Sequence, residues 1–359
     1  MASELDVPLS SPVLVTGATG YVAGWVVERL VRRGLTVHAA VRDPENESKI
    51  EHLAALAERL PGDVRFFQAD LLEPDSYADA MTGCSTVFHT ASPFVLTVED
   101  AQRDLVDPAV RGTRNVLSTA SATPGVTRVV VTSSCVAVFG DNTDVRYTKT
   151  GVFTEDDWNS TSSLTHNPYA YSKTLAEREA WRIASDQNSW SLVTVNPHFV
   201  FGPGVSPRSS SHSFHFLRQL GDGTFRSGVP AFGVAMVDVR DVAEMHVNAA
   251  FHPKAEGRYL TFAQSFSVDR IASVLRAHFG DRFLFPKRRI PKPAAWLFGP
   301  LADSSLTRKA ISRNVGVEWK GDNTKSIRDF DFEYRSIETS IVEMFEQLIE
   351  SGQVKAVSS

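Results

Sequence analysis

The sequence predicts an α/β fold in which a parallel sheet is covered by helices on both faces. The first observation is an apolar, β-branched run at residues 13–16 that breaks at a glycine turn and continues as a helix. The second is an alternation of strand and helix patterns that lasts to about residue 197. The third is a change of composition beyond that point. Together they predict a Rossmann-type, doubly wound parallel sheet with a smaller, mainly C-terminal substrate lobe.

The first strand and helix meet at Gly17 and Gly20. Beyond the turn, apolar residues recur at helical spacing up to Gly34, a typical helix end. Unpaired N–H groups and the positive helix end then face one point, which makes an anion site. Gly17 allows the turn, Gly20 lets the backbone approach a pyrophosphate, and Ala23 keeps helix and strand close. A dinucleotide site is predicted here, with an ordinary structural turn as the alternative.

The end of the second strand, Thr36 to Val41, selects the dinucleotide. NAD-binding units usually place an acidic residue there, roughly 20 residues beyond the glycines. Here Arg42 follows Val41, and a guanidinium holds a 2′-phosphate bidentately. Asp43 competes, but Pro44 predicts a turn that directs its side chain away, and Lys49 is a second candidate contact. NADPH/NADP+ is therefore the predicted cofactor, with a solvated Arg42 as the alternative.

The remaining elements of the sheet follow the same alternation. Because ligands of such sheets bind beyond the carboxyl ends of the strands, the strand ends are the places to search for chemistry. Further strands are predicted at Val64–Phe67, Thr86–His89, Arg128–Thr132 and Ser191–Val195, with helices at about Ala101–Ala120 and Ala170–Ala184.

Beyond Pro197 the pattern divides the chain into two lobes. Residues 202–233 are rich in Gly, Ser and Pro around a short helix at Ser213–Leu220, and Met236–Ala250 returns to the first lobe. From about residue 260, short elements, a Pro-rich segment and a terminal helix indicate the second lobe. The prediction is a dinucleotide-binding domain at 10–201, with 234–258 returning to it, and a substrate-binding lobe at 202–233 and 259–352.

Composition excludes several classes of protein. The net charge of −5, the pI near 6.1 and the lack of a long basic run argue against nucleic acid as a partner. Cys84 and Cys135 fit a reducing compartment and are too few for a metal cluster, so no metal is expected. No signal peptide or membrane-length apolar run is evident. We expect a cytoplasmic monomer or homodimer without a membrane partner, acting on a small molecule.

The candidate chemistry lies at the end of the fifth strand and in the next helix. The strand delivers Ser133 and Ser134, while Tyr169 and Lys173 are four residues apart and share one helical face. This pattern suits carbonyl reduction, because the oxygen that gains charge needs a proton donor. The pKa of a tyrosine is about 10, and a neighbouring ammonium is expected to lower it. Lysine also holds the nicotinamide ribose, and a serine hydroxyl stabilises the oxyanion.

A Tyr-x-x-x-Lys pair alone is weak evidence for a catalytic site, and its position in the chain strengthens that evidence. It is the only such pair in the chain and follows a Thr-Ser-Ser strand end. Tyr171 is not a candidate, because Leu175 stands four residues beyond it. The choice of Ser134 over Ser133 stays open from the residues alone.

Several motifs then occur in the order seen in one family. They are Val-Thr-Gly-Ala-Thr-Gly, Val-Arg-Asp-Pro, Val-Phe-His-Thr-Ala-Ser-Pro, Val-Thr-Ser-Ser, Tyr-x-x-x-Lys-Thr-Leu-Ala-Glu and Asn-Pro-x-x-Val-Phe-Gly-Pro. The chain resembles the extended short-chain dehydrogenases/reductases over about residues 12–265. Within them it is most similar to the dihydroflavonol-4-reductase and cinnamoyl-CoA-reductase group, including related aldehyde and methylglyoxal reductases.

The resemblance implies roles for individual residues. Tyr169 would be the general acid, Lys173 its partner, and Ser134 the carbonyl-binding hydroxyl. Arg42 and Lys49 would meet the 2′-phosphate. The expected cofactor-binding residues are Gly17, Thr19, Gly20, Tyr21, Val22, Arg42, Lys49, Asp70, Leu71, Thr90, Ala91, Ser92, Tyr169, Lys173, Pro197, Phe199 and Val200.

The substrate pocket and the departures from the family are less defined. The relay asparagine of many relatives would fall at Ala109, and residues 280–320 do not match the plant enzymes. The candidate pocket residues, each of which has ordinary core packing as its alternative, are Phe94, Val136, His198, Phe214 and Phe232.

The function expected from these residues is an NADPH-dependent carbonyl reductase for an aldehyde or ketone with an apolar or aromatic body. The alternatives are a nucleotide-sugar epimerase or dehydratase, 3-beta-hydroxysteroid-dehydrogenase-like oxidation, and a non-catalytic dinucleotide sensor. Arg42 in place of a strand-end acid counts against the epimerase, and the intact Ser, Tyr and Lys count against the sensor.

Overall fold

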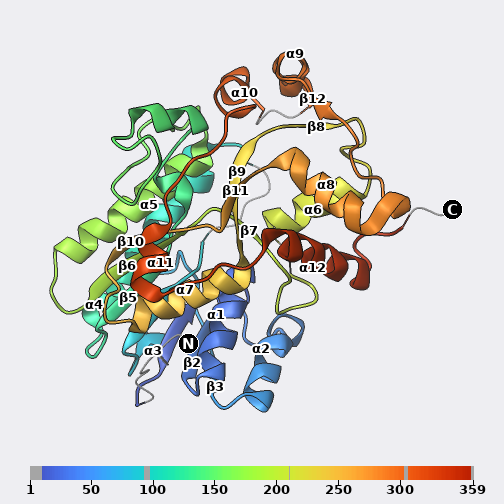
Figure 1. Cartoon of the computed structure of the whole chain (residues 1–359). Helices are drawn as coiled ribbons and strands as arrows, with labels where there is room; N and C mark the ends of the chain where they lie inside the picture. The colour runs from blue at the N-terminus through green and yellow to red at the C-terminus, as the bar shows by residue number, and fades with distance from the viewer. Residues whose placement is uncertain (1–9, 93–97, 210, 303–305, 357–359) are drawn as a thin grey trace.

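A computed structural model describes residues 10–92, 98–209, 211–302 and 306–356. Within these residues, seven strands form one parallel sheet in the order β10-β6-β5-β4-β1-β2-β3 (Figure 1). A three-stranded sheet, β11-β9-β7, and a β12-β8 pair lie outside it. The strands are β1 Val13–Thr16, β2 Thr36–Val41, β3 Asp63–Gln68, β4 Thr86–His89, β5 Arg128–Thr132, β6 Ser191–Pro197, β7 Phe199–Phe201, β8 Val229–Pro230, β9 Gly233–Asp238, β10 Gly257–Thr261, β11 Gln264–Ser267 and β12 Arg289–Ile290.

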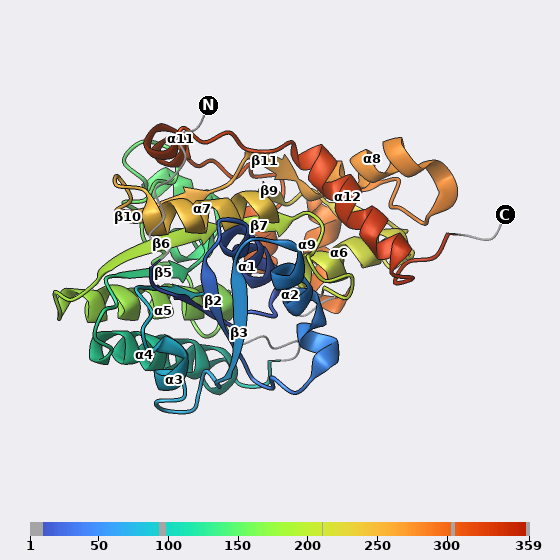
Figure 2. The same ribbon diagram turned by 90° about the horizontal axis from the view of Figure 1, so that it is seen from below.

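Helices cover both faces of the large sheet. The α-helices are α1 Tyr21–Arg32, α2 Glu47–Arg59, α3 Ala78–Met81, α4 Asp107–Ala122, α5 Pro168–Ser185, α6 His212–Gly221, α7 Val239–Phe251, α8 Val268–Phe279, α9 Lys292–Ala302, α10 Arg308–Asn314, α11 Thr324–Phe330 and α12 Ile337–Glu350. Shorter turns are the π-helical η1 Gln102–Val106 and the 3-10 turns η2 Cys135–Ala137, η3 Asn142–Tyr147 and η4 Gly280–Arg282. Figure 2 shows α4 and α5 on one face of the sheet and α1, α2 and α7 on the other. The predicted doubly wound Rossmann-type sheet is confirmed.

The core explains why the central strands read as continuous apolar runs. Val13, Leu14 and Val15 of β1 are fully buried, because helices cover both faces of a parallel sheet. On one face of the sheet, α1 and α7 pack side by side, and their apolar residues contact the strands. A second core lies among α6, α8 and α12, beside the small sheet.

Two elements differ from the sequence prediction. The helix expected at Ala101–Ala120 begins as the π-helical turn η1 and becomes regular only at Asp107, with Pro108 in its first turn. The segment expected to return to the first lobe, residues 234–258, ends inside a strand of the large sheet. This strand, β10, continues to Thr261. The described residues between 280 and 320 include β12, α9 and α10, which lie above the small sheet in Figure 1.

Charged contacts join α7 to the C-terminal part of the chain. The fully buried carboxylate of Asp238 accepts from the Ser340 hydroxyl at 2.6 Å, and Arg240 bridges Asp238 to Glu343. Asp241 accepts from the backbone N–H of Arg335 at 2.7 Å. No helix within the described part of the chain has the length and apolar character needed to span a bilayer.

Candidate active site

The glycine turn between β1 and α1 has the geometry of an anion site. Gly17 has φ +62, and a Cβ there would lie 3.0 Å from the Cα of Ala91. The N–H of Gly20 donates to the carbonyl of Gly17 at 2.9 Å, and α1 starts without a side-chain cap or an acidic residue in its first turn. The N–H groups in the first turn of α1 are therefore open to an anion, which fits the pyrophosphate of a dinucleotide.

The residues around this turn differ in what their side chains do. The Tyr21 hydroxyl donates to the Gly202 carbonyl at 2.6 Å, and its ring packs edge-on against Phe214. Burial raises the pKa of Tyr21 well above its usual value. The side chain of Tyr21 thus ties α1 to the second lobe, while Thr19 is exposed and Val22 is half-buried.

Hydrogen bonds to Thr16 place the end of β4 against the glycine turn. The N–H groups of Thr90 and Ala91 donate to Thr16 Oγ1 at 3.1 and 3.0 Å. The next residue, Ser92, accepts from Lys173 Nζ at 2.8 Å. Thr90, Ala91 and Ser92 therefore link the glycine turn to Lys173, and their place beside the cofactor stays a prediction.

At the end of β2, Arg42 is exposed and Asp43 is engaged. Asp43 Oδ1 accepts from the N–H of Glu45 at 3.1 Å, so its carboxylate serves its own turn. Arg42 and Lys49 are exposed, and neither forms an ion pair among the described residues. A carboxylate engaged in its own turn and two free cations are what a 2′-phosphate requires.

Asp70 and Leu71, at the end of β3, are both half-buried. Asp70 Oδ1 accepts from the N–H of Leu72 at 2.9 Å. The Leu71 side chain packs against Gly112 of α4. Their expected place beside the adenine stays a prediction.

The two serines after β5 have different partners. Ser133 is buried and donates its hydroxyl hydrogen bond to the carboxylate of Glu177. Ser134 is half-buried, lies 3.5 Å from the Pro197 carbonyl, and accepts from the N–H of Val136 at 3.3 Å. The hydroxyl of Ser133 is therefore engaged with a buried carboxylate, and the role of Ser134 as the carbonyl-binding serine stays a prediction.

Glu177 is a residue that sequence reasoning missed. Arg258 donates to it at 2.6 Å and Asn196 at 2.7 Å, in addition to Ser133. Its place in the Lys-Thr-Leu-Ala-Glu motif was visible, but Ser133 directly follows β5, Asn196 lies on β6 and Arg258 lies near the start of β10, so they share no local pattern with it. The cluster joins α5 to these three strands.

Tyr169 and Lys173 lie one helical turn apart at the start of α5. The helix begins at Pro168, and the preceding Asn167 adopts φ +52 and accepts from the N–H of Ala170 at 3.4 Å. Lys173 Nζ lies 5.9 Å from the centroid of the Tyr169 ring. The side chain of Tyr169 is 45% exposed, so a substrate can reach it.

The pKa of Tyr169 moves in the opposite direction from the prediction. The protein packed around the hydroxyl raises the pKa of Tyr169 to about 12, and burial lowers the pKa of Lys173 to about 8. The expected lowering of this pKa is therefore wrong in this structure, where desolvation is the cause of the shift. Tyr169 is held in the protonated form that a proton donor needs.

A small cavity adjoins Lys173 between β4, β5, α4 and α5. Ser92, Ser133, Glu177 and Ala109 contribute to its wall. His89 also lines it, and burial lowers the pKa of His89 to about 3, with the charge of Lys173 acting in the same direction. His89 is therefore neutral and hydrogen-bonded to Thr16 at 3.1 Å.

The residues predicted at the nicotinamide end and His198 of the predicted substrate pocket lie at the end of β6 and in β7. Pro197 ends β6, and Phe199 and Val200 follow it in β7, both half-buried. His198 is half-buried and stacks on Phe139. Its Nδ1 accepts from the N–H of Phe199 at 2.9 Å, and burial lowers the pKa of His198 to about 3.

The other pocket candidates have mixed outcomes. Val136 and Phe232 are half-buried, and Phe232 packs against the cluster that includes Ile311 and Val315. Phe214 is only 3% exposed and belongs to the core of the second lobe, which is the alternative its sequence context allowed. Phe94 lies outside the described residues. Among the residues described, no three His, Cys, Asp or Glu side chains gather in a way that could hold a metal ion.

Comparison with known proteins decides the family. The profile of the NAD dependent epimerase/dehydratase family matches residues 13–262. The chain belongs to this family. It is an extended short-chain dehydrogenase/reductase of the dihydroflavonol-4-reductase and cinnamoyl-CoA-reductase group.

The relatives of this chain include plant reductases and a yeast reductase of known structure. It is 36% identical over 319 residues to a cinnamoyl-CoA reductase of Medicago truncatula, covering 87% of this chain and 92% of that relative. It is 36% identical over 280 residues to an anthocyanidin reductase of Arabidopsis thaliana, covering 74% and 80%. The structure of Gre2 from Candida albicans in complex with NADPH superimposes with a TM-score of 0.75 at 27% identity, covering 95% of this chain and 99% of that one.

Proposed function

We propose that this chain is an NADPH-dependent carbonyl reductase that converts an aldehyde or ketone with an apolar or aromatic body to the alcohol. The observation that carries the proposal is the pairing of Tyr169 and Lys173 at the start of α5, where Lys173 Nζ lies 5.9 Å from the centroid of the Tyr169 ring and donates to Ser92. Relatives that are at least 30% identical are named as reductases, and Gre2 is a structure with NADPH bound. The chain is an oxidoreductase, and its cofactor is NADPH.

The cofactor contacts follow from the geometry of the turn and of the end of β2. The first turn of α1 would receive the pyrophosphate on its open N–H groups. Arg42 would hold the 2′-phosphate, with Lys49 as a second cation. Ser92, held by Lys173, and Pro197 would flank the nicotinamide end. When bound there, NADPH supplies the hydride.

The chemical roles of the side chains follow from their protonation. Ser134 donates a hydrogen bond to the carbonyl oxygen, which stabilises the charge that develops on it. Tyr169, whose pKa is raised to about 12, carries the proton that this oxygen takes up. Lys173, whose pKa is lowered to about 8, positions Ser92 and supplies positive charge beside Tyr169 near neutral pH.

The pocket residues support an apolar substrate. The N–H of Val136, two residues after Ser134, donates to the Ser134 hydroxyl, and Phe199 and Phe232 present half-buried aromatic rings on the second-lobe side. We expect the enzyme to work in the cytoplasm as a monomer or homodimer.

A panel of aldehydes, ketones and flavonoid-like substrates, followed at the NADPH absorbance, tests the proposal. NADPH consumption with formation of the alcohol, and release of NADPH when the alcohol is added with NADP+, are the expected results. An epimerase would change its substrate without net turnover of added cofactor, and a sensor would bind NADPH without turnover. Either result would contradict the reductase assignment.

A further inference from the structure

We propose that Asp141, His166, Arg313 and Asn314 form a positioning cluster through which α10 of the second lobe fixes the start of α5, and with it the place of Tyr169. The four residues are called the Asp141 cluster below. The inference rests on the proposed function only in giving Tyr169 its chemical role. Arg313 and Asn314 are 172 and 173 residues from Asp141 in the chain, so the cluster joins distant segments.

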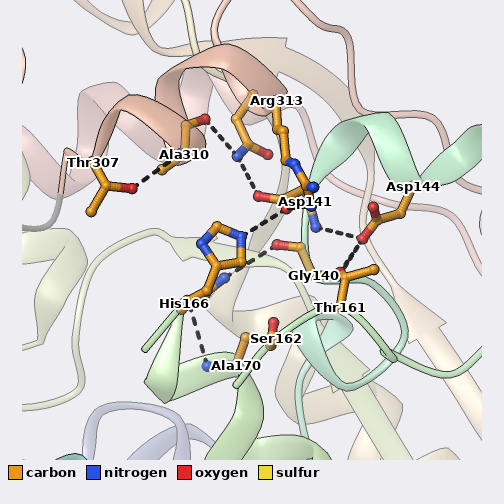
Figure 3. A network of polar contacts seen from close by, with 12 residues as sticks. Gly140, Asp141, Asp144, Thr161, Ser162, His166, Ala170, Thr307, Ala310 and Arg313 are labelled. Carbon is orange, nitrogen blue, oxygen red and sulfur yellow. Dashed lines mark hydrogen bonds and ion pairs between the residues drawn. The ribbon is translucent and has the colours of Figure 1, made fainter. Parts of the chain in front are cut away.

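The carboxylate of Asp141 is the centre of the cluster (Figure 3). Asp141 is 1% exposed, and His166 Nε2 and Arg313 Nη1 contact its Oδ2 at 2.8 and 3.0 Å. Asn314 Nδ2 donates to its Oδ1 at 2.8 Å. Burial works to raise the pKa of Asp141, but the hydrogen bonds from these three partners outweigh it and lower the pKa. A buried carboxylate with three donors holds those donors in one arrangement.

His166 and Asn167 connect this carboxylate to Tyr169. His166 stands three residues before Tyr169, and its backbone exchanges two hydrogen bonds with Ser163, at 2.8 and 3.2 Å. Asn167 Nδ2 donates to the carbonyl of Gly140 at 3.2 Å, next to Asp141. The two residues that lead into α5 are therefore both anchored to residues 140–141.

The anchoring loop is itself held in place. Asp144 Oδ2 accepts from the N–H groups of Gly140 and Asp141, at 3.3 and 2.9 Å, and from the hydroxyl of Thr161. Figure 3 shows these contacts on the side of Asp141 away from Arg313. The loop gives His166 and α10 a rigid body to bind.

On the other side, α10 carries the cluster into the second lobe. Asn314 Oδ1 accepts from the N–H of Asn142 at 2.8 Å, which gives α10 a second contact with this loop. Directly after α10, Val315 pairs with Phe232, a candidate pocket residue, and the N–H of Gly316 donates to the Ala231 carbonyl at 2.8 Å. The arrangement of α10 is thereby coupled to the wall of the candidate substrate pocket.

The consequence for the reaction is one of placement. A proton donor must lie within hydrogen-bond reach of its acceptor, and a shift of about 1 Å lowers a rate by up to about 10²-fold. Loss of a donor from Asp141 frees the residues before Pro168, so the first turn of α5 loosens. The glycine turn lies between β1 and α1 and Arg42 follows β2, so the phosphate contacts lie outside α5 and NADPH binding changes much less than the rate.

The test compares four variants with wild type in the NADPH-saturated enzyme. Arg313→Ala removes the partly exposed donor, and Asn314→Asp keeps the size of the side chain but sets a carboxylate against Asp141. His166→Leu removes a donor beside α5, and His166→Gln restores an N–H at a similar reach. Arg270→Ala is the matched control, because it breaks an exposed second-lobe ion pair, with Glu338 at 2.8 Å, that does not touch the cluster.

Two readouts are taken from each variant. Amide hydrogen exchange is followed in the first turn of α5, at Ala170 and Tyr171, and single-turnover hydride transfer is measured beside the dissociation constant of NADPH. For Arg313→Ala, Asn314→Asp and His166→Leu we expect faster amide exchange at Ala170 and Tyr171. We also expect hydride transfer to slow by about tenfold or more, while the dissociation constant of NADPH stays within about twofold of wild type. His166→Gln regains most of the rate, and Arg270→Ala behaves as wild type.

Wild-type exchange at Ala170 and Tyr171 in both Arg313→Ala and Asn314→Asp overturns the proposal, whatever the rates. So does an equal loss of rate in Arg270→Ala. If the wild type reduces no carbonyl, the proposed function fails, and the exchange measurement still decides whether the cluster positions α5.

Discussion

Ser133 gives its hydroxyl hydrogen bond to Glu177, and this contact separates two serines that the sequence alone leaves equivalent. The carboxylate of Glu177 is buried and also holds Arg258 and Asn196. Ser134, one residue further, has no such partner and is half-buried. We therefore expect Ser133 to stabilise the fold and Ser134 to contact the substrate.

Substitution of each serine by alanine should separate these roles. Ser134→Ala should slow hydride transfer by about 10–10³-fold, because a donor to the developing oxyanion is lost. Ser133→Ala should lower the free energy of unfolding by about 1–3 kcal/mol, because a buried carboxylate loses a hydrogen bond. Single-turnover kinetics and denaturant unfolding of both variants check this. The reverse assignment of effects would contradict it.

Arg42 should decide the choice of cofactor. NADPH should exceed NADH in catalytic efficiency by at least about tenfold, since a charge-assisted hydrogen bond contributes about 1.5–3 kcal/mol. Arg42→Ala should raise the KM for NADPH and leave that for NADH nearly unchanged. Steady-state kinetics with both cofactors measure this. Equal use of the two cofactors by the wild type is incompatible with the assignment.

The glycine turn should tolerate no side chain at Gly17. Gly17→Ala adds a Cβ at 3.0 Å from the Cα of Ala91 to a residue with φ +62. Gly151→Ala is the control, because its φ is +77 but nothing lies within 4 Å of the added Cβ. The left-handed conformation costs about 1–2 kcal/mol in both, and crowding adds to this only at Gly17. Thermal unfolding and NADPH titration should show the larger loss, and weaker binding, for Gly17→Ala alone.

Reduction should depend on the protonation of Lys173. Because burial lowers its pKa to about 8, the ammonium is present below that pH and lost above it. With substrate and NADPH saturating, the rate should therefore fall as pH rises through about 8, while Tyr169, at about 12, stays protonated. A pH profile of single-turnover reduction checks the direction. A rate that rises steadily to pH of about 10 would exclude this role for the lysine.

Local patterns predict much of the fold, because they are written in neighbouring residues. The buried strand into Gly17, the α1 stripe and the Tyr169–Lys173 face each depend on a few consecutive positions. The Pro168 start of α5 follows for the same reason. These features lie where the sequence predicts them.

Contacts between distant segments explain what the sequence did not predict. Arg258 and Glu177 are 81 residues apart in the chain, so no local sequence pattern predicts that they form an ion pair. The pKa of Tyr169 is raised by desolvation, which depends on the protein packed around it and not on the spacing of neighbouring residues. The burial of Phe214 likewise depends on Tyr21, on a helix almost two hundred residues earlier.

The central claim is that Tyr169 donates the proton, and single-turnover NADPH oxidation with cofactor-saturated Tyr169→Phe tests it most directly. Tyr171→Phe is the matched control, two residues away on another face of α5. Tyr169→Phe is expected to bind NADPH nearly as wild type but to lose about 10²–10⁴-fold in rate, while Tyr171→Phe keeps most of its activity. A Tyr169→Phe enzyme that retains more than about a tenth of the wild-type rate would contradict this role of Tyr169.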